Sequence, residues 1–126
     1  IEARIMGELC TSHILPPAIK YQNTLIENIR GLKEIGLKES AYTNQQQILE
    51  KISDHISQIS AQVSQMIEAR KKANAIKDIR ERAIAYCDHV KEPFFDKIRY
   101  NVDKLELLID DSEWLLPKYR EILFLR

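Results

Sequence analysis

The sequence predicts an all-α fold: an elongated three-helix bundle that runs up, down and up and ends in a short C-terminal tail. Only three Gly and four Pro occur in 126 residues, fewer than turns and sheets usually require, and 30% of the residues are charged. Apolar residues also recur at helical spacing along three long stretches. We expect helices over about 1–35, 43–71 and 78–109 that form one bundle, 1–109, followed by a docking tail, 110–126.

The first helix is predicted from apolar residues at helical spacing, with Gly36 as its stop, because glycine is favoured just past a helix C-terminus. Pro16 and Pro17 interrupt this helix and should kink or break it, since a proline ring donates no backbone hydrogen bond and clashes with the preceding turn. The apolar positions are Ile1, Ile5, Leu9, Ala18, Tyr21, Leu25, Ile29 and Leu32.

The second helix is predicted to begin at a capping box, Thr43-Asn44-Gln45-Gln46, in which the Thr43 hydroxyl and the Gln46 amide would satisfy backbone donors. Its apolar residues alternate steps of three and four, the seam of coiled-coil-like packing, and the residues between them are polar. The seam consists of Leu49, Ile52, Ile56, Ile59, Val63 and Met66.

The third helix is predicted from a new apolar series displaced by one residue from the previous register, so the chain should turn near 72–77. Asp78, with Glu81 three residues on, has capping-box spacing, although Asn74 could cap instead. Pro93 should kink this helix at a height similar to Pro16. The apolar series is Ile76, Ile79, Ala83, Tyr86, Val90, Ile98, Val102, Leu105 and Ile109.

Composition argues against several classes of partner. Lys plus Arg and Asp plus Glu each number 19, so no excess positive charge would collect nucleic acid or anionic lipid. Two cysteines are too few for a disulfide scaffold, and no apolar run is long enough to span a membrane. We therefore expect a cytoplasmic chain, and because it opens without Met inside a helical phrase, we expect one domain of a larger protein.

No reaction site is evident in the sequence. Cys10 with His13 and Cys87 with His89 could suggest zinc, but Cys87 and His89 lie about 200° apart on a helix, so buried free thiols and partly exposed imidazoles are favoured. His55 is interpreted as a solvated histidine. No phosphate loop or nucleophile elbow is present, so we predict no catalytic, cofactor-binding or metal residue here.

The tail combines the only Trp with Pro and several large apolar residues, the kind of segment that docks on another surface. Aromatic and Arg side chains are the types that anchor interfaces. The predicted docking residues are Trp114, Pro117, Tyr119, Arg120, Ile122, Leu123 and Phe124.

The tail resembles the C-terminal region of type III glutamine synthetases, in which two acidic residues precede a Trp and a Pro-Lys-Tyr-Arg-Glu phrase. A second similarity lies in Ile14-Leu15-Pro16 and the following Tyr21-Gln22. The chain departs from the family at Leu115 and Pro17, where the family usually has proline and a small residue. The matching tail residues are Asp110, Asp111, Trp114, Pro117, Lys118, Tyr119, Arg120, Glu121, Ile122, Leu123 and Phe124.

This resemblance implies a parent enzyme of nitrogen metabolism that joins ammonia to glutamate with ATP and a divalent metal such as Mg, in a large homo-oligomer. It places the catalytic barrel upstream, and no catalytic residue of the family matches a position here. The fragment would then be inactive, and its tail would pack against the upstream catalytic domain or a neighbouring subunit.

Two alternatives remain open at this point. An independent coiled-coil adaptor would use the seam of the second helix to recruit a partner helix or to self-associate. A metal-binding bundle is the weaker alternative. The sequence also leaves open whether the tail docks in cis or in trans, the oligomeric state of the isolated chain and any regulatory ligand.

Overall fold

The structure is a computed structural model that describes residues 2–109, and these form helices and short connections with no strand. The predicted all-α class is confirmed. The helical elements are α1 (Glu2–Leu9), the π-helical turn η1 (Cys10–Ile14), α2 (Leu15–Glu34), the 3-10 turn η2 (Glu39–Ala41), α3 (Thr43–Asn74), α4 (Ile79–Ala85), the π-helical turn η3 (Tyr86–Lys91) and α5 (Glu92–Leu108).

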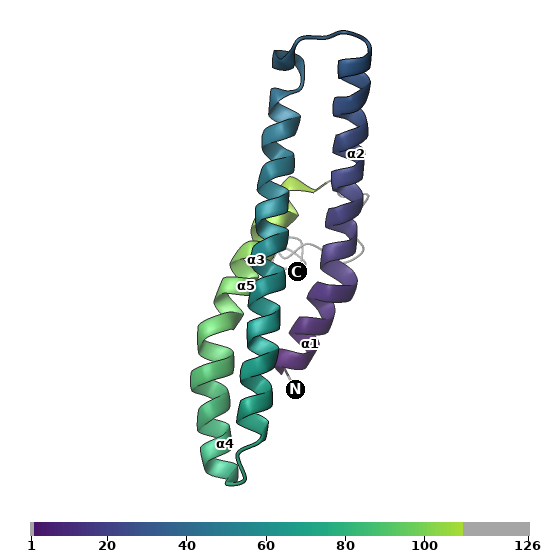
Figure 1. Ribbon diagram of the computed structural model, residues 1–126. Coiled ribbons are helices and arrows are strands. Elements are labelled where there is room, and N and C mark those ends of the chain that lie inside the picture. The colour runs from purple at the N-terminus through teal and green to yellow at the C-terminus, as the bar shows by residue number, and fades with distance from the viewer. Residues whose placement is uncertain (1, 110–126) are drawn as a thin grey trace, which may run out of the picture.

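These elements make three long rods, as Figure 1 shows: α1–η1–α2, then α3, then α4–η3–α5. The second rod ends at Asn74, three residues beyond the predicted 71. It lies between the other two rods. The hairpin formed by the end of α2 and the start of α3 extends beyond the end of α5. The predicted tail, 110–126, lies outside the described residues.

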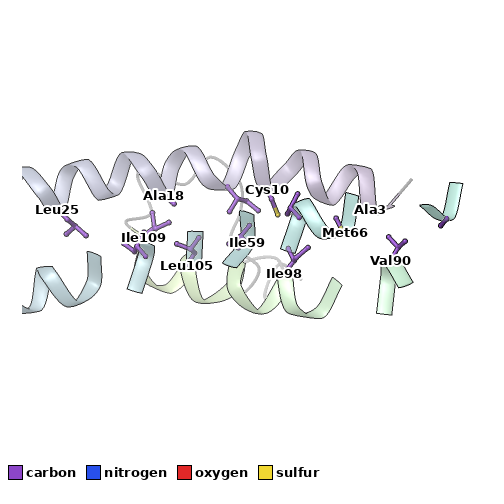
Figure 2. Packing of buried hydrophobic residues seen from close by; sticks show 14 residues of the cluster. Ala3, Cys10, Ala18, Leu25, Ile59, Met66, Val90, Ile98, Leu105 and Ile109 are labelled. Atoms are coloured by element: carbon purple, nitrogen blue, oxygen red, sulfur yellow. The ribbon is translucent and has the colours of Figure 1, made fainter. Parts of the chain in front are cut away.

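Side chains from all three rods meet in one core. Figure 2 shows Ala18 and Cys10 of the first rod facing Ile109, Leu105 and Ile98 of the third, and Leu25 continues the same core beyond Ile109. The predicted seam of the second helix lies in this core, with Ile52, Ile59, Val63 and Met66 buried and Leu49 and Ile56 packed against them. The seam expected to recruit a partner helix in the adaptor alternative is thus filled from within the chain.

The face that α1 buries differs from the predicted one. Ile5 and Leu9 are 52% and 38% exposed, whereas Ala3, Gly7, Cys10 and Ile14 are buried. A Cβ added to Gly7 would lie 3.5 Å from Val63 Cγ1, so small residues let α1 approach α3 closely. Because α1 lies close to α3, it buries the face with the small residues and leaves its more apolar face exposed. Ile79 of the third apolar series is likewise 79% exposed.

Two of the three predicted helix boundaries have the expected local chemistry. Gly36 has φ +84°, and the amides of Gly36 and Leu37 donate to the carbonyls of Lys33 and Leu32, which makes a Schellman stop. Asp78 caps α4, because its Oδ2 accepts from the Glu81 amide at 2.9 Å.

The capping box predicted at Thr43 is wrong. Tyr42 occupies the N-cap position without a side-chain cap, and the Thr43 hydroxyl donates backward to the Glu39 carbonyl at 2.8 Å. The 3-10 turn η2 supplies that carbonyl one turn before α3, and a local bond from a Thr hydroxyl to a preceding carbonyl is an alternative to capping the helix.

Candidate functional site

A π-helical turn lies just before Pro16 and another just before Pro93. In η1 the Leu15 amide donates to the Cys10 carbonyl, and in η3 the Glu92 amide donates to the Cys87 carbonyl, five residues back in both cases. Proline at the next position has no amide to donate, and its ring clashes with the carbonyl four residues back in a regular α-helix; a wider preceding turn relieves that clash. The kinks predicted at Pro16 and Pro93 stay predictions, and a π-turn before each proline is the feature that the sequence pattern did not show.

The two prolines do not lie at one height. The Ala3 amide donates to the Tyr86 hydroxyl at 3.0 Å, and Glu2 lies 4.0 Å from Lys91, so the start of α1 is level with η3. Pro16 is thirteen residues beyond Ala3 but Pro93 is seven beyond Tyr86, an offset of roughly 9 Å at 1.5 Å per residue. The expected common height is therefore wrong.

The same offset separates the two Cys-His pairs. Cys10 is 2% exposed in the core, and burial raises the pKa of its thiol to about 11, so it stays neutral. Cys87, His13 and His89 are exposed, so the expectation of a buried thiol holds for Cys10 and fails for Cys87. Within residues 2–109 no three His, Cys, Asp or Glu side chains are grouped so that they could hold a metal ion.

A polar cluster in the core joins α3 to α5. Asn101, 2% exposed, donates from Nδ2 to Gln62 Oε1 at 3.1 Å and to the Lys97 carbonyl at 3.2 Å. Its Oδ1 therefore faces His55 Nδ1 at 2.8 Å, which requires the hydrogen of this pair to be on Nδ1. His55 is half-buried and bonded, so the solvated interpretation is wrong.

Sequence reasoning missed Asn101, although a signal existed. Asn101 falls between Ile98 and Leu105 on the buried stripe of α5, at a spacing of three and four residues. An amide on an apolar stripe needs partners from the neighbouring helix, and polar residues at such positions can fix the register of paired helices.

Two grooves flank α3. The larger, about 560 Å³, lies between the C-terminal half of α3 and η3, with an apolar floor of Ala69, Ala73, Ile76 and Ala85 and with His89 among its polar residues. The smaller, about 350 Å³, lies in the α2–α3 hairpin and is lined by Ile26, Ile29, Arg30, Lys33, Gln46 and Leu49. Both have the size of ligand or side-chain sites and neither holds a reactive constellation.

The predicted docking residues lie outside the described residues. They are Trp114, Pro117, Tyr119, Arg120, Ile122, Leu123 and Phe124. No helix among residues 2–109 combines the length and apolar character required to cross a bilayer.

Comparison with known proteins finds similarity to one family. Residues 1–33 match the family described as the glutamine synthetase C-terminal domain, a range that covers α1, η1 and most of α2. The chain is 43% identical over 98% of its length to a glutamine synthetase of Bacteroides fragilis. It is 27% identical over its whole length to the type-3 glutamine synthetase of Dictyostelium discoideum. The chain spans 17% of the length of each relative.

Proposed function

Because the chain corresponds to the C-terminal region of a glutamine synthetase, we propose that it is the non-catalytic helical domain of a type III enzyme and serves packing and oligomer assembly. The parent would ligate ammonia to glutamate with ATP and a divalent metal. The observation that carries this proposal is the 43% identity over 98% of the chain.

The described part of the chain offers no site for the metal that the parent would need. Residues 2–109 offer no group of three potential metal ligands, so we assign Mg and ATP to other parts of the parent. The two free thiols, Cys10 and Cys87, suit the reducing cytoplasm, where we place the enzyme.

A packing role is supported by the form of the domain. Three rods that share one core make a stiff projection, and grooves remain open on both flanks of α3. We propose that the predicted docking residues, Trp114 to Phe124, attach this projection to the upstream catalytic domain or to a neighbouring subunit. Aromatic, Arg and large aliphatic side chains are suited to that contact.

The proposal is tested by ending the parent before Ser112 and measuring its assembly by analytical ultracentrifugation. We expect the oligomer to dissociate at concentrations at which the intact enzyme remains assembled. The matched pair Trp114→Ala/Phe124→Ala and Lys118→Ala/Glu121→Ala separates apolar docking from a general effect of altering the tail, because only the first should weaken assembly. Unchanged assembly after truncation would refute the docking role.

A further inference from the structure

The groove in the α2–α3 hairpin, called here the hairpin groove, has an apolar floor and a cationic rim. Ile29 is 8% exposed at its floor, and Leu49 packs partly against the core. Arg30 and Lys33, both exposed, are the charged residues that line it, and no carboxylate does. The Lys33 ammonium lies 5.5 Å from the Tyr42 ring centroid, which holds that charge near α3. The groove therefore suits an apolar segment that also carries negative charge.

This groove faces away from α5. Gln46 at the groove and His55 at the α5 contact are nine residues apart on α3, which is about half a turn at roughly 100° per residue. Asn101 fixes α5 on the His55 side at 2.8 Å. Neither α5 nor any other described helix covers the groove.

The chain contains a segment of matching chemistry. Asp110, Asp111 and Glu113 precede Trp114, and Leu115 and Leu116 follow it, so three carboxylates come just before the only Trp and two aliphatic side chains. We propose that residues 110–116 of a second copy of this chain occupy the hairpin groove, with their carboxylates on Arg30 and Lys33 and Trp114 on the apolar floor. This inference rests on the proposed function, because it needs a neighbouring subunit.

The direction of the chain favours a second copy over the same chain. The segment begins after Ile109, which is buried against the core on the α5 side of the hairpin. To reach its own groove it would have to pass around a helix about 10 Å wide. A second copy meets no such obstacle, and reciprocal exchange gives a two-fold contact in which each chain supplies one segment and one groove.

The experiment places a photo-crosslinker in the assembled full-length enzyme. Trp114→p-benzoylphenylalanine enzyme is prepared with ¹⁵N-labelled and unlabelled subunits mixed before assembly, irradiated and digested, and its cross-linked peptides are identified by mass spectrometry. The expected result is cross-links to the α2 and α3 peptides that contain Ile26 and Leu49, joining labelled to unlabelled chains. Cross-links to these peptides only within single chains, or only to other surfaces, would overturn the inference.

Charge reversal supplies the matched control. Arg30→Glu/Lys33→Glu should lower the yield of these cross-links at least about fivefold, and adding Asp110→Lys/Asp111→Lys should restore it. Lys38→Glu/Lys51→Glu makes the same change in net charge outside the groove and should leave the yield unchanged. An equal loss in both double variants would overturn the charge pairing.

The two proposals fail in different ways. If Trp114 cross-links to the catalytic domain while truncation still dissociates the enzyme, the groove assignment is wrong and the assembly role stands. If truncation leaves assembly intact, the assembly role itself is wrong.

Discussion

Asn101 is the buried polar side chain that connects α5 to α3. Its amide satisfies two acceptors and one donor, from Gln62, Lys97 and His55, so none of its polar atoms is left without a partner. Sliding α5 by one residue would bury these groups without partners, which makes this register more favourable than its neighbours.

Replacing Asn101 by Ala should lower the free energy of unfolding by about 1–3 kcal/mol, because His55 and Gln62 lose buried partners. The measurement is urea unfolding followed by circular dichroism. Asn23→Ala, at an exposed position of α2, is the control and should change stability by less than about 0.5 kcal/mol. Equal effects would show that the polar cluster adds nothing.

The two cysteines should differ sharply in reactivity. At pH 8 a disulfide reagent should label the exposed Cys87 at least about 100-fold faster than Cys10, whose buried thiol has a pKa raised to about 11. Cys10→Ser and Cys87→Ser variants assign the two phases. A fast phase that survives in Cys87→Ser would contradict the burial of Cys10.

The raised Cys10 pKa also sets the sign of a pH effect. Between about pH 9 and 11 the unfolded chain loses this proton while the folded chain keeps it, so stability should fall as pH rises through that window. Below pH 9 the folded and unfolded states both hold the proton, so Cys10 does not make the free energy of unfolding depend on pH there. Comparison of wild type with Cys10→Ser across this window isolates the effect.

At the scale of elements, the two expected helix starts differ in chemistry. Asp78 accepts from the Glu81 amide, whereas Thr43 donates away from its helix. Asp78→Ala should therefore cost about 1 kcal/mol of unfolding free energy and Thr43→Ala less than about half of that. Chemical denaturation of both variants tests this difference, and a larger loss at Thr43 would favour the capping box after all.

Gly7 lies where α1 approaches α3 closely. Its position beside Val63 leaves room for one methyl group, so Gly7→Ala should be neutral or stabilise by up to about 1 kcal/mol through higher helix propensity. Gly7→Leu should destabilise by about 1–3 kcal/mol, since a longer side chain must displace Val63 or Ile67.

Gly31 is the matched control for this prediction. No atom lies within 4 Å of a Cβ built there, so both Ala and Leu should fit without displacement. Thermal unfolding of the four variants separates packing from propensity. If Gly7→Leu were as stable as Gly31→Leu, α1 would not lie against Val63.

At the scale of the whole molecule, α3 is the element against which both other rods pack. Ile59 is fully buried at the middle of this shared core. Ile59→Ala should cost about 2–5 kcal/mol. Hydrogen exchange of the most protected amides should accelerate by the same factor in α2 as in α5, because a shared core makes the two helices unfold as one cooperative unit.

Ile26→Ala, at a position 39% exposed, should change these exchange rates little and serves as the control. Acceleration confined to α5 in Ile59→Ala would show that α2 and α5 belong to separate cores.

The sequence by itself determined the helical class, the seam of α3 and the Gly36 stop, and it narrowed the cap of the third helix to Asp78 or Asn74. Each of these depends on contacts within a few residues, on periodicity or on the conformational freedom of a glycine. Spacing alone also placed the breaks near Gly36 and 72–77.

Only the tertiary structure decided which face of α1 is buried, how far the third rod is offset from the first, and that His55 meets Asn101. The face of α1 with the smallest residues is buried instead of its most apolar face, because α3 approaches closely at Gly7. The offset and the polar cluster depend on residue pairs 39 to 89 positions apart. Spacing can place Asn101 on the buried stripe of α5, but it does not identify the partner residue, since each helix satisfies its own spacing whatever its register with the next.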